Sequence, residues 1–252
     1  GLVALTLLAS FGLARSRVDD GLALWAPALL GAYFLYASAT VWFATHEYWA
    51  ALFMLIGLWG WMSGRPGPGS LFLALAILSR ELFAFLLLPL AAFAVLGSPV
   101  ERTWARGTLV TVGLLYLAHY AYVLGVIQAA NSVVSTWQAG GPGFLKTSLQ
   151  FGTVYVGARN HLWFPLLAAG AAGACLTRDW RTRVLVAWSV LVPLAAFLLI
   201  GQEGRFYWGV VAVPQLLAAV PLLGGVLTGE VAGRKGPGPL AEDSPEIPSS
   251  VS

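Results

Sequence analysis

The sequence predicts an all-α protein built as a polytopic transmembrane helical bundle. Hydrophobic residues make up 58% of the 252 residues and charged residues only 10%, whereas soluble globular domains carry about 25% charged residues. Apolar runs of helical length recur along almost the whole chain, and the short alternating segments of a membrane β-barrel do not appear. We therefore expect about nine membrane segments in residues 1–228. A disordered cytoplasmic tail is expected over 229–252, where Pro, Ser and acidic residues are frequent.

Each expected segment is an apolar run bounded by charged residues or by Pro and Gly. The chain begins inside such a run, so we expect the natural N-terminal part to be missing. Residues 63–69 (SGRPGPG) form a turn, 98–106 a charged loop, and 129–160 a long polar connection that is either a lid or a simple connector. The expected segments, in order, are 2–14, 22–44, 48–62, 70–80, 83–97, 107–128, 161–176, 184–200 and 206–228.

The stretch 70–97 decides the topology. As one straight helix it would be roughly 42 Å long, against a hydrocarbon core of about 30 Å. Arg80 and Glu81 would then lie inside the lipid, where a charge costs about 2.5–3.5 kcal/mol. The alternative is two short helices that meet at a turn at these two residues. The first helix is too short to cross a bilayer, so this turn must open into a protein-lined recess. Pro89 predicts a kink in the second helix.

The distribution of basic residues favours the broken form. With a single span, Lys and Arg divide almost evenly between the two faces, whereas two helices give ten on one face and four on the other. Such a bias marks the cytoplasmic face. The expected cytoplasmic set is Arg15, Arg17, Arg65, Arg102, Arg106, Arg178, Arg181, Arg183, Arg234 and Lys235, and the opposite set is Arg80, Lys146, Arg159 and Arg205.

The broken form also gathers polar side chains from separate connections on the non-cytoplasmic side. Arg binds phosphate oxygens in a bidentate manner. A carboxylate acts as a general base, binds sugar hydroxyls or holds a divalent metal. A recess with these groups suits a substrate that carries a phosphate and polar hydroxyls, with or without a divalent metal. The residues are His46, Glu47, Arg80, Glu81, Lys146, Arg159, His161, Glu203 and Arg205.

These residues also have structural interpretations. Glu47 at a helix start would stabilise the helix dipole, and Arg205 would anchor the membrane interface beside Tyr207; for both residues the two interpretations stay open. Arg80 and Glu81 would pair with each other or with another helix, but at this depth we prefer a functional role.

Other features of the sequence exclude several classes of function. The single Cys175 excludes an internal disulfide and a Cys metal cluster. A net charge of +3 gives no basic surface for nucleic acid. No P-loop, Rossmann, HExxH or GxSxG pattern is present. We interpret His119, inside segment 107–128, as a hydrogen-bonded packing residue, and Lys146 and Arg159 as ordinary loop charges.

Four stretches, taken together, carry a family resemblance. THEYWAALFMLIGLW (45–59) opens a helix with an acidic residue, and SGRPGPG is a short turn with a basic residue. LFLALAILSRELFAFLLLPL (71–90) joins a small apolar helix, a basic residue and a Leu- and Pro-rich helix, and EGRFYWGVVAVP (203–214) opens a late helix. In this order they resemble the GT-C glycosyltransferases, polytopic mannosyl- and arabinosyltransferases that use polyprenyl-phosphate sugars.

The resemblance implies an inverting sugar transfer on the non-cytoplasmic side of a bacterial plasma membrane. A lipid-linked sugar is the donor, and a glycan, lipid or protein is the acceptor. Arg80 and Arg205 match positions that hold the donor phosphate, and Glu47 matches an acidic residue that lines the cavity. The implied substrate-binding set is His46, Glu47, Arg80, Glu81, Glu203, Arg205 and Tyr207. The catalytic acid is expected in an outer loop that this chain lacks, so the chain alone is expected to be inactive.

Two alternatives stay open. Transporters and flippases of lipid-linked polar substrates also use broken helices, but with inverted repeats and charges near the midplane. No repeat is visible in the sequence, and the expected charges lie on one face, which favours the enzyme. A non-catalytic membrane scaffold would need none of the buried charge.

Overall fold

The computed structural model describes residues 1–38, 46–130, 139–154, 163–201 and 209–229. The regular elements in these ranges are helices, which confirms the all-α prediction. Three helical stretches are long and apolar enough to cross a membrane, namely Pro99–Val126, Trp180–Leu199 and Val211–Thr228. The other apolar helices reported for these ranges are shorter, so the expected number of about nine spans is not established.

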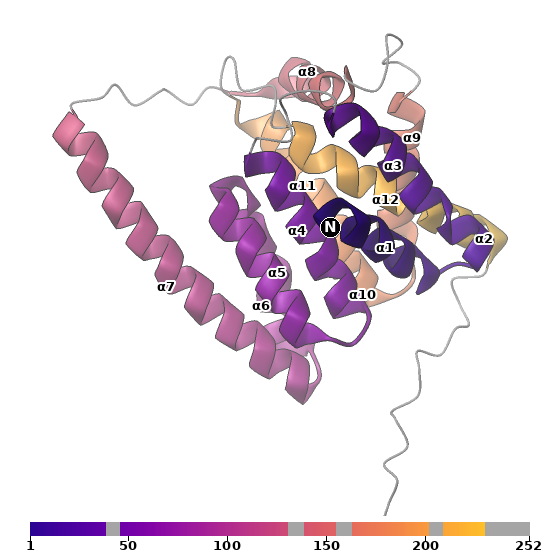
Figure 1. Cartoon of the computed structure of the whole chain (residues 1–252), viewed down its shortest axis with the longest axis horizontal. Helices are drawn as coiled ribbons and strands as arrows, with labels where there is room; N and C mark the ends of the chain where they lie inside the picture. The colour runs from indigo at the N-terminus through magenta and orange to yellow at the C-terminus, as the bar shows by residue number, and fades with distance from the viewer. Residues whose placement is uncertain (39–45, 131–138, 155–162, 202–208, 230–252) are drawn as a thin grey trace, which may run out of the picture.

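The helices follow the order of the expected segments with shifted boundaries (Figure 1). The expected segment 22–44 is divided into α2 and α3, and the polar connection 129–160 contains a helix, α8. The elements are α1 Leu2–Arg15, α2 Asp20–Ala23, α3 Trp25–Ser38, α4 His46–Met62, α5 Pro66–Ser79, the 3₁₀ helix η2 Glu81–Leu86, α6 Leu87–Leu96, α7 Pro99–Ala130, α8 Gly141–Val154, α9 Trp163–Leu176, α10 Trp180–Thr182, the π-helical turn η4 Arg183–Ala187, α11 Trp188–Leu199 and α12 Gly209–Thr228.

Helices α4 and α5 form a tightly packed antiparallel hairpin. Gly64 at the turn has a φ of +71°, which favours glycine. A Cβ atom at Gly60 would lie 2.7 Å from the Cα of Gly69, and a Cβ at Gly57 would lie 2.6 Å from Leu73. Only glycine lets the two backbones approach so closely. The resulting register places the first turn of α4 beside the last turn of α5.

The chain breaks at Arg80, as the sequence predicts. Helix α5 ends at Ser79, and Arg80 is extended, with φ −155° and ψ +124°. Its carbonyl accepts a hydrogen bond of 3.0 Å from the N–H of Phe83, which begins the 3₁₀ helix η2. The expected second helix, 83–97, is divided into η2 and α6, and the change from 3₁₀ to α-helical geometry at Leu87 lies just before Pro89. Proline removes the hydrogen bond to the carbonyl four residues before it, so an irregularity at this place agrees with the predicted effect of Pro89.

The second half of the broken pair returns to the end of the molecule where α5 begins. A Cβ at Gly67, near the start of α5, would lie 3.0 Å from Trp104 in the second turn of α7. Arg106 of α7 donates a hydrogen bond of 3.1 Å to the carbonyl of Ala94 in α6. The turn 63–69 and the start of α7 therefore lie at the same end, as the two-helix form requires.

Helix α7 begins earlier than expected, and the charged loop 98–106 is wrong. The carboxylate of Glu101 accepts a hydrogen bond of 2.7 Å from the Ser98 N–H, and the Ser98 hydroxyl lies 3.4 Å from the Glu101 N–H. This is a capping box, with Pro99 at the first helical position. The motif Ser98-Pro99-Val100-Glu101 carries this signal in the sequence, so the helix start could have been recognised there.

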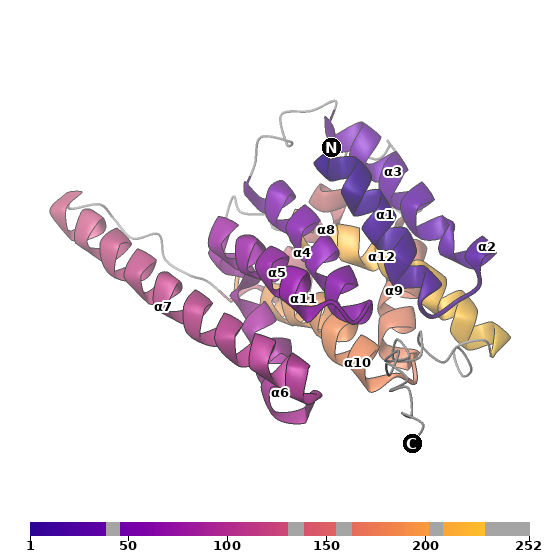
Figure 2. The same cartoon turned by 60° about the horizontal axis from the view of Figure 1, so that its bottom comes forward.

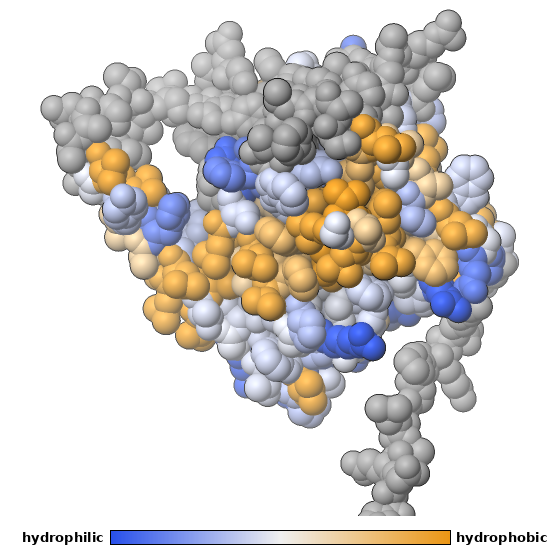
Figure 3. Space-filling view, in the orientation of Figure 1, coloured by the Kyte–Doolittle hydropathy of each residue, from blue (hydrophilic) through white to orange (hydrophobic). Residues whose placement is uncertain are grey.

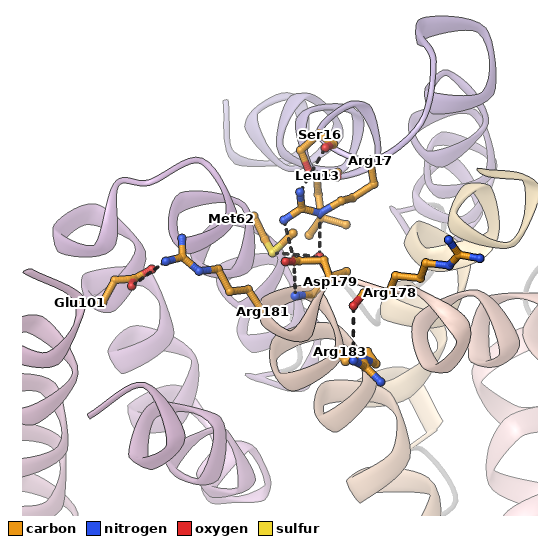
Figure 4. A network of polar contacts seen from close by, with 10 residues as sticks. Leu13, Ser16, Arg17, Met62, Glu101, Arg178, Asp179, Arg181 and Arg183 are labelled. Carbon is orange, nitrogen blue, oxygen red and sulfur yellow. Dashed lines mark hydrogen bonds and ion pairs between the residues drawn. The ribbon is translucent and has the colours of Figure 1, made fainter. Parts of the chain in front are cut away.

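A polar network joins several connections at this end, which we call the arginine-rich end (Figure 4). Arg17 lies 2.7 Å from Asp179, and Arg181 lies 3.2 Å from Glu101. Both the N–H and the hydroxyl of Thr182 donate hydrogen bonds to Asp179. In the described residues this end contains Arg15, Arg17, Arg65, Arg102, Arg106, Arg178, Arg181 and Arg183, all from the expected cytoplasmic set.

The carboxyl of Asp179 is held in its charged form. Burial raises its pKa, but the hydrogen bonds from Thr182 and the charges of Arg17 and Arg181 outweigh burial. The net result is a pKa below the ordinary value of an aspartate. Asp179 also caps the helix that begins at Trp180. One carboxylate therefore fixes α1, the connection after α9 and the start of a candidate span.

The surface has an apolar band of the kind that faces lipid. Figure 3 shows hydrophobic residues across the middle of the visible face, with hydrophilic residues mainly below it and at its sides. The far half of α7 extends away from the other helices in both views (Figures 1 and 2). Leu114 and Leu117 on this helix are exposed by 63% and 64%. Such exposure of large apolar side chains is stable in lipid but unfavourable in water.

Candidate functional site

An ion pair between Glu47 and Arg80 forms the base of the site. The Nε of Arg80 lies 2.9 Å from Oε1 of Glu47, and the two side chains are exposed by only 19% and 8%. The hairpin register explains the pairing, because the two residues lie at nearly equal distances along the chain before and after Gly64. Each charge is also favourable where it lies, since Glu47 is in the first turn of α4 and Arg80 follows the last turn of α5.

A cavity of about 570 Å³ opens beside this pair. Helix α4 contributes His46 and Trp49, and the end of α5 contributes Arg80 with Ile77 and Leu78. The third wall belongs to α7. It consists of Leu115, Tyr116 and His119.

The cavity lies at the end of α4 that is remote from the arginine-rich end. Met62, the last residue of α4, lies 3.7 Å from Thr182 in the polar network described above. His46, the first residue of α4, lines the cavity. The 17 residues of α4 span about 25 Å at 1.5 Å per residue. The cavity and the arginine-rich end are thus separated by most of the thickness of a hydrocarbon core, about 30 Å.

The chemistry of the walls suits an amphiphilic anion. Arg80 supplies a guanidinium that Glu47 holds in place, and such a group binds phosphate or carboxylate oxygens. Both histidines are exposed in the cavity and offer ring nitrogens as hydrogen-bond donors or acceptors. Ile77, Leu78 and Leu115 supply apolar surface. One molecule with an anionic group and a hydrocarbon part could contact all of these walls.

The structure brings together three of the residues that the sequence singles out, His46, Glu47 and Arg80. Glu81 begins η2, and its side chain lies outside the part of the structure that is described. Lys146 is exposed on α8. The remaining candidates, Arg159, His161, Glu203, Arg205 and Tyr207, lie outside the described residues, so their predicted roles stay predictions.

The interpretation of His119 as a hydrogen-bonded packing residue does not agree with its position. It is exposed and lines the same cavity as Arg80. Tyr116 and His119 are three residues apart, a spacing that puts both side chains on one face of a helix. That spacing is visible in the sequence. The fact that this face of α7 looks toward the end of α5 is not, because it depends on how α7 packs.

The described residues contain no group of three or more His, Cys, Asp or Glu side chains placed to hold a metal ion. Comparisons with protein-family models, with curated proteins and with solved structures gave no match to this chain. The resemblance to the GT-C glycosyltransferases therefore rests on the sequence motifs alone.

Proposed function

We propose that the protein is a membrane glycosyltransferase that moves a sugar from a polyprenyl-phosphate donor to an acceptor on the non-cytoplasmic face. The observation that supports this best is the ion pair of Glu47 and Arg80 beside a cavity with both apolar and polar walls. The cavity lies away from the arginine-rich end, which by the positive-inside rule faces the cytoplasm. In a bacterium this arrangement would put the active side outward from the plasma membrane.

In this proposal Arg80 binds the donor phosphate, and Glu47 is a positioning residue that fixes the guanidinium. A general base takes the proton of an acceptor hydroxyl, whose oxygen attacks the anomeric carbon. The bond between that carbon and the phosphate oxygen breaks, and the lipid phosphate leaves with its charge stabilised by Arg80. His46 and His119 contact the donor phosphate or the acceptor hydroxyls. The proposal assigns the general base to none of the described residues.

The test compares Arg80→Ala and Arg80→Lys in the full-length protein, with a radiolabelled polyprenyl-phosphate sugar as the donor. Loss of a preorganised charge-stabilising group typically lowers the rate by about 10²–10³-fold, and we expect such a loss for Arg80→Ala. Arg80→Lys should retain part of the activity because it keeps the charge but not the planar fork. Lys146→Gln, an exposed cation outside the cavity lining, is the matched control and should retain full activity.

Unchanged transfer and unchanged donor affinity in Arg80→Ala would remove Arg80 from the site. If the full-length protein binds the donor and moves it across the bilayer without transferring its sugar, the flippase alternative is correct instead.

A further inference from the structure

A second cavity lies on the outer surface of α9 and α11, near the arginine-rich end. Its volume is about 610 Å³. Cys175 of α9 forms one side of it, and Arg183, Ala187, Trp188, Leu191 and Ala195 contribute to the other. The residues from Ala187 onward recur at spacings of one, three and four, so they form one stripe along a helix. The cavity is therefore a groove parallel to α11, a candidate membrane-crossing helix.

The length of the groove corresponds to one leaflet. From Arg183 to Ala195 a helix rises about 18 Å, and half of a hydrocarbon core is about 15 Å. An acyl chain that begins near Arg183 would therefore end close to the bilayer midplane. Trp188, exposed by 44%, stands one turn beyond Arg183 and is suited to the interfacial region.

Arg183 gives the groove a charge at its polar end. It donates a hydrogen bond of 3.3 Å to the carbonyl of Arg178 and, among the described residues, it forms no ion pair with a carboxylate. It also begins the π-helical turn η4, an irregularity that is frequent at functional sites. In Figure 4 the side chain of Arg178 extends away from Arg183, so the two guanidinium groups are separate.

We propose that this groove is a binding site for an anionic phospholipid of the cytoplasmic leaflet. One acyl chain lies along Ala187, Leu191 and Ala195, and the phosphate of the headgroup binds Arg183. Basic pockets on the cytoplasmic side of membrane helices recognise anionic headgroups in this way. The site requires that the protein is inserted in a membrane, but it does not depend on sugar transfer, and its lining shares no residue with that of the cavity at Arg80.

Cys175 makes the test specific, because it is the single cysteine of the chain and it is exposed in the groove. The full chain is labelled there with bimane and reconstituted in phosphatidylcholine vesicles. Phosphatidylglycerol or phosphatidylcholine with brominated acyl chains is then added at equal mole fraction. A single basic contact contributes about 1 kcal/mol near a membrane surface. We therefore expect the brominated phosphatidylglycerol to occupy the groove about fivefold more strongly, as measured by bimane quenching.

Four variants separate the contribution of the Arg183 charge from that of the apolar surface of the groove. Arg183→Gln should abolish the preference for the anionic lipid, whereas Arg183→Lys and Arg178→Gln should keep it. Ala195→Phe should fill the groove and reduce quenching by both lipids. The surface control carries Cys175→Ser with Leu117→Cys on exposed α7, and there the two lipids should quench equally. Glycerol phosphate in the buffer should displace nothing, since the proposed ligand is a lipid and not a free phosphate.

Equal quenching by the two lipids at Cys175, or an unchanged preference in Arg183→Gln, would overturn the proposal. So would displacement by glycerol phosphate. A complete lack of quenching at both labelled positions would show that the chain is not in the bilayer, which would overturn the membrane function as well. A lipid preference at Cys175 together with unchanged sugar transfer in the Arg80→Ala variant would leave this proposal standing and reject the proposed role of Arg80.

Discussion

Two ion pairs of equal length and different burial allow the role of Glu47 and Arg80 in stability to be measured. The pair in the cavity and the pair of Arg15 with Asp20 both have an N–O separation of 2.9 Å. The side chains of the second pair are exposed by 55% and 57%, against 19% and 8% for Arg80 and Glu47. The N–O separation therefore does not account for a difference in coupling energy between the two pairs, and burial is the factor that the comparison tests.

We expect Arg80→Gln to lower the free energy of unfolding by about 3 kcal/mol, because it leaves a buried carboxylate without its cation. Glu47→Gln should cost less, about 1–2 kcal/mol, since the remaining guanidinium is more exposed and interacts with the C-terminal dipole of α5. The double variant should be more stable than the sum of the two losses predicts, by a coupling energy of about 2 kcal/mol. For Arg15→Gln and Asp20→Asn the coupling energy should be below about 1 kcal/mol.

The assay is reversible unfolding in mixed detergent micelles, followed by far-ultraviolet circular dichroism for each single and double variant. Added salt should weaken the Arg15–Asp20 coupling and leave the buried coupling nearly unchanged. If the two couplings agree within about 0.5 kcal/mol, burial does not strengthen the cavity pair, and the explanation for its position would be wrong.

Three further predictions concern the packing and the ends of helices. Gly69→Ala should destabilise the α4–α5 hairpin, because a Cβ there would lie 2.8 Å from the backbone N of Trp61. In the control Gly113→Ala, a Cβ would meet nothing within 4 Å, so this variant should be neutral or stabilising by up to about 1 kcal/mol. Equal melting temperatures of the two variants would contradict the close packing at Gly69. Ser98→Ala should cost about 1 kcal/mol by loss of the capping box at the start of α7, measured as the midpoint of detergent unfolding, and no loss would mean that the cap is not formed. Because the pKa of Asp179 is lowered on folding, its stabilisation should be complete above the unfolded value near 3.9 and disappear as the pH falls through the lower folded value. The difference in melting temperature between Asp179→Asn and the unsubstituted protein should therefore vanish in strong acid, and a constant difference from pH 7 to pH 2 would refute the linkage.

The sequence predicted best those features that depend on charged residues and on the ends of helices. The break at Arg80 follows from the cost of placing two adjacent charges in lipid, and the common location of Arg17, Arg65, Arg102 and Arg181 follows from the bias of basic residues. The capping box before α7 was also present in the sequence, but the charged character of 98–106 led to its interpretation as a loop. These features are local, because they depend on a charge, a cap or a turn and its immediate environment.

Both candidate binding sites, the cavity beside Arg80 and the groove beside Arg183, were decided by tertiary packing. The pairing of Glu47 with Arg80 depends on the register of two helices, which Gly60 and Gly69 set by close backbone approach. His119 joins them only because α7 begins at Pro99 and leans against α5 and α6, so that one of its faces meets the end of α5. The groove beside Arg183 likewise exists between two helices and in neither alone. The sequence by itself determined which residues avoid lipid and where helices end, because each of these depends on the free energy of a single residue in its immediate surroundings. It could not determine which distant side chains share a cavity, because that depends on the packing of several helices at once.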